Sequence, residues 1–210
     1  MSNSSPDFKL RLFNRWASSY DWLFPSVFYQ AIHQRLLEFV HLPDRPYVLD
    51  LGCGTGRLLD RLAATFPELR GIGIDYSPEM IHQAKQRDRY SERITYLQGR
   101  AESLPVPDQQ FDAVFNTVSF LHYSSPESVL AEVSRVLSPG GYFYLADFCS
   151  RWATQPQQWG VAPGRIRLYS PVVREALGQA AGLGSMGHHY LLGPVVLSVF
   201  SKPDIEITGT

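Results

Sequence analysis

The sequence predicts an α/β protein with a doubly wound, mostly parallel sheet of seven strands, helices on both faces of the sheet and a helical cap at the N-terminus. From Tyr47 onward, short apolar runs rich in β-forming residues alternate with amphipathic helical stretches, which is typical of βαβ units. One of these runs, residues 48–51, leads directly into a glycine-rich turn and then a helical stretch. Near the C-terminus two β-like runs flank Gly193-Pro194, which favours an antiparallel hairpin that closes the sheet.

The parallel part of the sheet is expected between residues 47 and 148. Its strands are the apolar runs at residues 47–51, 71–75, 94–98, 111–116 and 142–148. The helices between them are expected at residues 56–66, 78–89 and 126–137. The last helix is followed by Ser138-Pro139-Gly140-Gly141, whose proline and glycines end a helix and start a turn. These strands and crossovers are sufficient for a doubly wound sheet.

The segments on either side have different patterns. Residues 151–165 carry Trp, Gln, Pro and Gly without periodicity, so we expect a long loop there. A helix at residues 171–181 and hairpin strands at 188–192 and 195–200 follow. Residues 1–45 are rich in aromatic side chains, and those at helical spacing favour a helix that buries one face on the sheet: Phe13, Trp16, Tyr20 and Leu23. A lid over the site and attachment to a membrane surface are the alternatives.

Composition excludes several classes of partner. The formal net charge is -1, so no basic field is available to hold a nucleic acid backbone. No run reaches the roughly 18 apolar residues of a spanning helix, although peripheral contact with a membrane stays open. The two cysteines, Cys53 and Cys149, have neither metal-ligand nor redox spacing, which favours a cytoplasmic location. Because His188-His189 also has no partner ligands at metal spacing, we expect no metal site.

The strongest single signal is the pattern Asp50-x-Gly52-x-Gly54-x-Gly56 between a buried strand and a helix. Glycines at alternate positions permit unusual dihedral angles and let a ligand approach the backbone closely. Asp75 follows Gly56 by 19 residues and ends the next strand, where a carboxylate can accept hydrogen bonds from both hydroxyls of a ribose. The pattern is neither the G-x-G-x-x-G of dinucleotide sites nor a P-loop with its lysine. It suits a cofactor with a charged amino-acid end and a ribose, as in S-adenosylmethionine.

Around these residues the chain resembles the class I S-adenosylmethionine-dependent methyltransferases, which have a Rossmann-like sheet. Five segments match the family in its order: residues 50–56, its first motif; 75–80, its ribose segment; 99–105, its adenine loop; 111–114, its fourth strand; and 135–141, the run into its fifth. Residues 13–21 and 192–197 are also similar to parts of the quinone-biosynthesis C-methyltransferases. Trp22-Leu23-Phe24-Pro25 departs from that narrower signature.

The resemblance implies one methyltransferase domain over residues 1–210: a helical cap at 1–45, a cofactor-binding core at 46–148 and a substrate-side loop, helix and hairpin at 149–210. It implies S-adenosylmethionine as cofactor, with the backbone at Gly52 and Asn116 holding the methionyl ammonium and Asp75 the ribose. Many relatives have Asp at the position of Arg100, so the adenine contact passes to Ala101 or Glu102. The full set of cofactor residues is Tyr20, Asp50, Gly52, Cys53, Gly54, Asp75, Tyr76, Ala101, Glu102 and Asn116.

The catalytic residue is left open by the sequence. His122 follows the fourth strand, where a neutral imidazole could take a proton from the acceptor, and pocket lining is the alternative role. The Cys53 backbone explains its position without a nucleophilic thiol. A small, apolar or aromatic acceptor fits the N-terminal aromatics. The alternative functions are a non-catalytic S-adenosylmethionine-binding partner subunit and an NAD-dependent oxidoreductase. The oligomeric state is not predicted.

Overall fold

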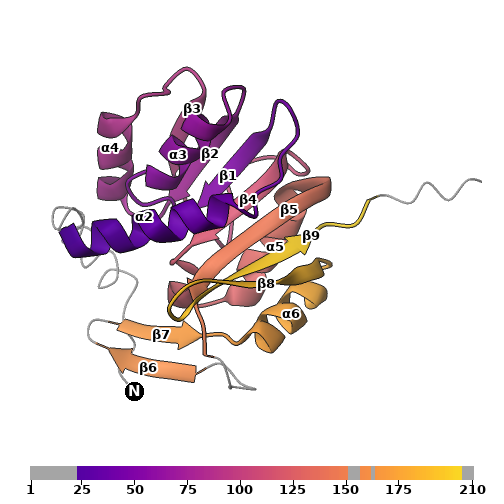
Figure 1. The fold of residues 1–210 in the computed structure, drawn as a ribbon. Helices are drawn as coiled ribbons and strands as arrows, with labels where there is room; N and C mark the ends of the chain where they lie inside the picture. The colour runs from indigo at the N-terminus through magenta and orange to yellow at the C-terminus, as the bar shows by residue number, and fades with distance from the viewer. Residues whose placement is uncertain (1–22, 151–156, 162–163, 205–210) are drawn as a thin grey trace, which may run out of the picture.

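A computed structural model describes residues 23–150, 157–161 and 164–204. Its main sheet has seven strands in the order β3-β2-β1-β4-β5-β9-β8. The strands from β3 to β5 run parallel, whereas β9 pairs antiparallel with both β5 and β8. Figure 1 shows the helices distributed over both faces of this sheet. The predicted doubly wound sheet with its closing hairpin is confirmed.

The elements follow the chain in the expected alternation. The strands of the main sheet are β1 (Tyr47–Leu51), β2 (Arg70–Asp75), β3 (Ile94–Gln98), β4 (Phe111–Thr117), β5 (Leu137–Phe148), β8 (Gly184–Leu192) and β9 (Val195–Ser201). The helices are α2 (Leu23–Leu37), α3 (Arg57–Thr65), α4 (Pro78–Arg87), α5 (Pro126–Val136) and α6 (Pro171–Ala180), with a 3-10 turn η1 (Phe120–His122). Ser77 caps α4 by accepting from Met80 N at 3.2 Å, and Pro78 occupies the first turn, where its missing N–H costs nothing.

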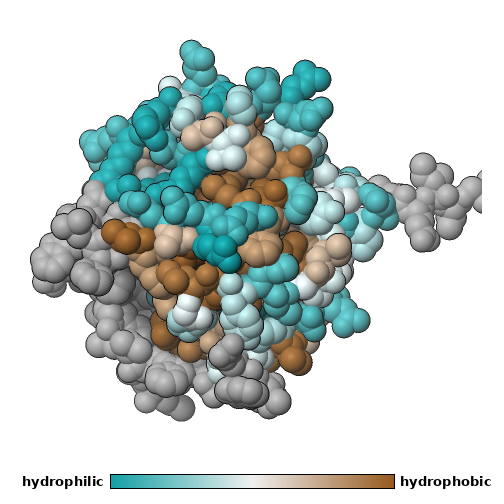
Figure 2. Space-filling model, in the orientation of Figure 1, coloured by the Kyte–Doolittle hydropathy of each residue, from teal (hydrophilic) through white to brown (hydrophobic). Residues whose placement is uncertain are grey.

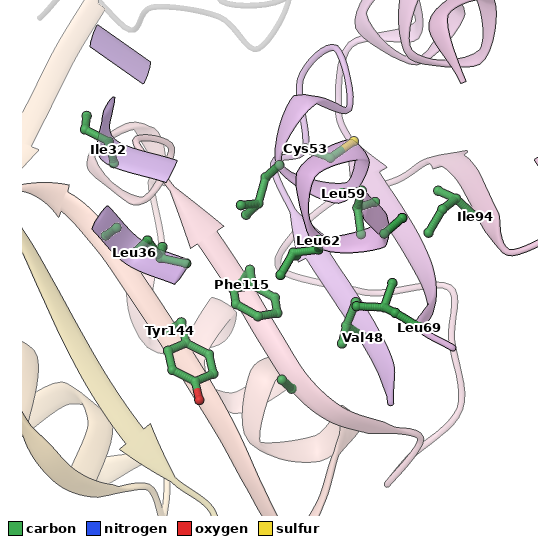
Figure 3. Close-up of a cluster of buried hydrophobic side chains, with 14 of the residues drawn as sticks. Ile32, Leu36, Val48, Cys53, Leu59, Leu62, Leu69, Ile94, Phe115 and Tyr144 are labelled. Atoms are coloured by element: carbon green, nitrogen blue, oxygen red, sulfur yellow. The ribbon is translucent and has the colours of Figure 1, made fainter. Parts of the chain in front are cut away.

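Alternating side chains along the central strands build two hydrophobic clusters, one on each face of the sheet. On β1, Val48 belongs to the cluster beneath α2 and α3, whereas Leu49 belongs to the cluster beneath α5. Figure 3 shows the first cluster, in which Phe115 and Tyr144 from adjacent strands lie below Ile32 and Leu36 of α2. The rings of Phe115 and Tyr144 are stacked with centroids 5.0 Å apart. Helix α2 therefore covers the centre of the sheet from one side.

Three segments differ from the prediction by more than two residues. The segment expected as a loop contains an antiparallel pair, β6 (Gln157–Val161) and β7 (Gly164–Leu168). Its glycines and proline concealed a period-two alternation of charged and apolar residues from Arg165 to Leu168. The turn that was predicted after α5, at residues 138–141, lies within β5, where the pairing with β4 shifts register. Gly140 has a φ of +74° at this irregularity. Strand β8 begins four residues earlier than expected, at Gly184.

The N-terminal cap is described only from Leu23 onward. Phe13, Trp16 and Tyr20 lie outside the described residues. In α2, Ile32 and Leu36 are fully buried, as expected of a helix that packs on the sheet. Figure 2 shows hydrophobic residues in the middle of the face that α2 crosses, with hydrophilic residues gathered above them. Within the described residues, every helix is too short or too polar to cross a membrane.

Candidate functional site

The candidate site lies where the carboxyl ends of β1, β2 and β4 meet. The chain order along the sheet reverses between β1 and β4, and a doubly wound sheet binds its ligand in the crevice at such a reversal. Asp50, Asp75 and Asn116 all belong to the last two residues of these strands. The fold therefore brings together residues that are far apart in the sequence.

The turn between β1 and α3 uses its glycines as predicted. Gly52, Gly54 and Gly56 have φ angles of +72°, +52° and +79°, a region that side chains disfavour. The N–H groups of Gly52 and Cys53 both donate to Ile74 O, at 2.7 and 3.1 Å, which ties the turn to β2. A Cβ on Gly52 would lie 2.4 Å from Ser119 Oγ. The turn is therefore closed on its protein side and has no room for a side chain at Gly52.

Asp75 connects the glycine turn to the start of α4. Its Oδ2 accepts from Gly54 N at 2.9 Å, and its Oδ1 accepts from Ser77 N at 2.8 Å. Burial raises the pKa of Asp75, while these backbone donors act in the opposite direction. Each carboxylate oxygen can accept a second hydrogen bond. Asp75 can therefore shape the turn and still accept from two ligand hydroxyls.

Asp50 is the least satisfied polar group of the site. It is 1% exposed, and neither carboxylate oxygen has a hydrogen-bond partner among the described residues. Burial, and then the charge of Asp75, raises the pKa of Asp50 to about 8. A buried carboxyl without donors is costly, so it marks a place where a cationic ligand would be stabilised. Burial also raises the pKa of the Cys53 thiol, which keeps the sulfur protonated and unsuited to act as a nucleophile.

Asn116 organises the other side of the crevice. Its Nδ2 donates to Leu51 O at 2.8 Å, to Ser119 Oγ at 2.7 Å and to Tyr123 OH at 3.0 Å. The Asn116 side chain is fully buried, and its Oδ1 has no partner among the described residues. Asn116 therefore fixes the end of β1 and holds two hydroxyl groups next to Gly52.

The outer edge of the site carries an aromatic ring and a pair of opposite charges. The guanidinium of Arg100 lies 5.6 Å from the ring centroid of Tyr76, and Arg100 Nε is 3.8 Å from Glu102 Oε2. Ala101 between them is buried. Arg100 therefore stands beside the predicted adenine contacts, Ala101 and Glu102.

Asp147, at the end of β5, holds the segment that contains His122. Asp147 Oδ2 accepts from Leu121 N at 2.9 Å, and His122 N donates to Ser119 O at 3.0 Å. Behind it, the buried Arg174 donates to Asp147 O and Phe148 O, both at 3.0 Å. Burial raises the pKa of Asp147 to about 6, against the lowering effect of Arg174. The segment that contains His122 is thus anchored to β5 by Asp147, and Arg174 ties the end of β5 to α6.

Sequence reasoning located most of this site. The structure brings together Asp50, the glycine turn, Asp75 and Asn116, and it places Tyr76, Ala101 and Glu102 at the ends of β2 and β3. Tyr20 lies outside the described residues. The roles of Ser119, Tyr123 and Tyr96 were missed. Tyr96 OH would lie 2.5 Å from a Cβ on Gly56. A tyrosine in a predicted strand gives no indication of such a contact with the glycine turn.

The arrangement defines a class of site. Two acids flank a glycine turn that has no lysine, which suits a ligand with positive charge and ribose hydroxyls and disfavours a pyrophosphate. The methyltransferase domain family matches residues 49–145. An uncharacterized methyltransferase of Synechocystis sp. is 33% identical over 160 residues, which cover 70% of each chain. The chain belongs to the S-adenosylmethionine-dependent methyltransferases, which decides against the oxidoreductase alternative.

Two further relatives have stated activities. A fatty-acid O-methyltransferase of Mycolicibacterium smegmatis is 35% identical over 123 residues, covering 59% of this chain and 44% of the relative. A demethylmenaquinone methyltransferase of Deinococcus radiodurans is 32% identical over 165 residues, covering 78% and 64%. The chain thus matches about half to two thirds of the length of these relatives, and the similarity to quinone-biosynthesis enzymes is confirmed.

Solved structures share the fold. A putative methyltransferase in complex with the Trm112 activator of Haloferax volcanii has a TM-score of 0.80 at 22% identity and covers 91% of this chain and 96% of that one. A 1,6-didemethyltoxoflavin-N1-methyltransferase of Burkholderia thailandensis, solved with S-adenosylhomocysteine, has a TM-score of 0.76 at 20% identity, with coverages of 97% and 93%. Both support the Rossmann-like architecture.

Proposed function

We propose that this protein transfers a methyl group from S-adenosylmethionine to a small, apolar or aromatic acceptor. The observation that carries the proposal is the unpaired, buried carboxyl of Asp50 behind a glycine turn that is fixed by Asp75. Two acids beside a glycine turn without a lysine favour a cofactor with an ammonium and a sulfonium, because the positive charges of such a cofactor compensate the negative charges of the acids.

The described residues fit the parts of this cofactor. Asp75 would accept from the ribose hydroxyls, and Asp50 would stabilise the methionyl ammonium, directly or through water. The backbone at Gly52 and Asn116 would complete the ammonium site. Tyr76, Ala101 and Glu102 would hold the adenine, with Glu102 constrained by Arg100. Cys53 and Gly54 contribute backbone, and Tyr20 is proposed to close the site from the N-terminal cap.

The protein's contribution to the reaction is alignment. When bound, S-adenosylmethionine supplies a methyl group whose bond to sulfur breaks, with the electron pair staying on sulfur, as a bond to the acceptor forms. Asp147 and Asn116 fix the η1 segment and the crevice, so that the acceptor atom is held in line. His122 in η1 is proposed to line the acceptor side and to take a proton from acceptors that carry one.

The acceptor class rests on the relatives and on the apolar surroundings. Two of the relatives are named for largely apolar acceptors, a fatty acid and demethylmenaquinone, whereas others are named for malonyl-[acyl-carrier protein]. A panel of fatty acids, quinols, phenols and charged or macromolecular acceptors, assayed with labelled cofactor, tests this class. Methylation confined to the charged or macromolecular acceptors would contradict it.

The first experiment is calorimetric titration of the purified protein with S-adenosylmethionine, S-adenosylhomocysteine and NAD. Micromolar binding of the first two without NAD supports the cofactor site, and no binding of either contradicts it. The absence of turnover with every acceptor class, although the cofactor binds, would instead favour a non-catalytic, cofactor-binding partner subunit. Turnover by the isolated chain would eliminate it. We also propose a single methyltransferase domain and a cytoplasmic location, in keeping with two buried cysteines that form no disulfide among the described residues.

A further inference from the structure

His188 on β8 belongs to a hydrogen-bonded chain of side chains that the proposed function does not use. Its Nε2 lies 3.0 Å from Glu175 Oε1 on α6, and its Nδ1 lies 2.9 Å from Ser198 Oγ on β9. Ser198 Oγ in turn accepts from Nη1 of Arg174 at 3.2 Å. The side chain of Glu175 is 47% exposed, whereas Ser198 and Arg174 are buried. The chain therefore leads from the protein surface to a buried guanidinium.

The groups at the two ends of this chain set the direction of its hydrogen bonds. The exposed carboxylate of Glu175 can only accept, so Nε2 of His188 carries the hydrogen between them. Nδ1 of the neutral ring then has a lone pair, and the hydroxyl of Ser198 donates to it. The guanidinium of Arg174 can only donate, so Ser198 Oγ accepts from it. Each of these hydrogens thus has its own acceptor when the ring of His188 is neutral.

The hydroxyl of Ser198 makes Arg174 dependent on His188. Ser198 is fully buried, so its hydroxyl relies on protein groups for its hydrogen bonds. Without Nδ1 of His188, the hydroxyl hydrogen loses its acceptor next to the guanidinium, and an unpaired buried donor costs free energy. A change at His188 therefore reaches Arg174 through Ser198, although His188 and Arg174 share no printed contact of their own.

Arg174 extends the chain to the segment that contains His122. Its Nη2 donates to Asp147 O and Phe148 O, both at 3.0 Å, at the end of β5. The carboxyl of Asp147 accepts from Leu121 N at 2.9 Å, within η1. The end of β5 thus connects the guanidinium to η1, which the proposed function assigns to the acceptor side of the crevice.

We propose that His188 and Ser198 are positioning residues for methyl transfer, which act on η1 through Arg174 and Asp147. This role rests on the proposed function, because it is the proposed function that places the acceptor next to η1. Neutral His188 keeps the acceptor segment in one arrangement, and alignment is the protein's main contribution to the reaction. The proposed cofactor acids lie on β1 and β2, on the other side of β4, so the chain affects the acceptor side and leaves cofactor binding unchanged.

The test compares two replacements of His188 that differ in one contact. The amide of His188→Asn can take the place of Nδ1 and accept from Ser198, whereas the amide of His188→Gln takes the place of Nε2 and leaves Ser198 without its acceptor. Hydrogen exchange measured by nuclear magnetic resonance should show protection of the Leu121 amide lowered about five- to tenfold in His188→Gln and less than about twofold in His188→Asn. The reference is the amide of Tyr47, which donates to Asp112 Oδ2 at 2.8 Å at the start of β1 and should keep its protection in both variants.

Ser198→Ala tests whether His188 acts through the hydroxyl. This variant should lower the protection of the Leu121 amide by a similar factor, and adding His188→Gln to it should cause no further loss, because both changes interrupt one chain. His189→Gln is the matched control, since His189 stacks on Phe39 at a centroid distance of 4.2 Å instead of joining the chain. Additive losses, or equal protection in His188→Asn and His188→Gln, would overturn the inference.

A kinetic measurement connects the chain to the reaction. With the acceptor of the panel that the unmodified protein methylates fastest, kcat should fall about five- to tenfold in His188→Gln and recover in His188→Asn. The affinity for S-adenosylhomocysteine in calorimetric titration should change less than about twofold in both variants. An unchanged kcat in His188→Gln would reject the positioning role. Failure of the unmodified protein to bind the cofactor would reject the proposed function and this role with it, and the exchange data, which need no ligand, would tell that failure apart from a broken chain.

Discussion

Asp75 Oδ2 accepts a hydrogen bond from the backbone N–H of Gly54 at 2.9 Å, across 21 residues of sequence. This single contact joins the acid at the end of β2 to the glycine turn after β1. Asp75 also accepts from Ser77 N at the start of α4. One carboxylate thus orders two backbone segments that border the proposed cofactor site, so its removal should affect both the ribose contact and the shape of the turn.

Replacing Asp75 with Ala should weaken binding of S-adenosylmethionine and S-adenosylhomocysteine about 10- to 100-fold, because hydrogen bonds to a charged group contribute about 1.5–3 kcal/mol. Calorimetric titration checks this. Asp112→Asn is the control, since Asp112 Oδ2 accepts from Tyr47 N at the far end of β1 and removing its charge should change stability only. Unchanged affinity in Asp75→Ala would reject the ribose assignment.

Cofactor affinity should depend on pH through Asp50. Its pKa of about 8 in the free protein means that it is largely protonated at neutral pH, whereas a bound ammonium favours the carboxylate. Binding should therefore release a proton below pH 8, and affinity should rise with pH between about 6 and 8, by at most tenfold per unit. Titrations in buffers of different ionisation enthalpy measure that proton. Asp50→Asn should abolish the release, and a release that persists in this variant would assign it to another group.

Asp50 should also make the free protein less stable as pH rises. Its pKa is about 8 when folded against 3.8 ordinarily, so the folded state binds more protons and the free energy of unfolding falls between about pH 4 and 8. Asp147, with a folded pKa of about 6, acts in the same direction at lower pH. Urea unfolding of Asp50→Asn at pH 6 and 8 should show a smaller difference than the unmodified protein. An equal difference would mean that Asp50 is not the titrating group.

Local signals made the cofactor half of the site predictable. The acid at Asp50, the alternate glycines and Asp75 all follow directly from strand ends, and in a parallel sheet the carboxyl ends of neighbouring strands share one edge. The positive φ angles at Gly52, Gly54 and Gly56 were predictable for the same reason. Such a pattern holds no information about which residues after β4 form the other side of the crevice.

The contacts that were missed depend on tertiary packing. Ser119 Oγ reaches Leu51 O across 68 residues of sequence, and the pattern around Ser119 gives no sign of it. Arg174 lies in a helical stretch where an arginine is ordinarily exposed, yet it is 1% exposed. The strands β6 and β7 were not predicted, because the glycine and proline residues of this segment indicated a loop more strongly than its short alternation indicated strands. Each case follows from contacts between segments, which single-sequence periodicity does not encode.

Gly52→Ala should abolish cofactor binding and lower the free energy of unfolding by about 2–4 kcal/mol, since it combines an unfavourable φ of +72° with a Cβ 2.4 Å from Ser119 Oγ. Gly54→Ala is the matched comparison. Gly54 also has a positive φ, but its Cβ would meet nothing within 4 Å, so only the conformational cost of about 1 kcal/mol should appear. Urea unfolding measures both. Equal losses in the two variants would mean that the contact with Ser119 is readily relieved.

Arg174 should be among the most costly residues to replace. Its guanidinium donates to Val196 O, Ser198 Oγ, Asp147 O and Phe148 O, and so joins α6 to the ends of β5 and β9. Arg174→Met keeps the aliphatic stem but leaves these acceptors and the Asp147 carboxyl without their cation, which should cost about 3–5 kcal/mol of unfolding free energy. The comparison is Arg167→Met, whose partly exposed side chain donates to Ser124 O and should cost less than about 1 kcal/mol. Similar losses in the two variants would show that the buried guanidinium contributes no more than a surface contact.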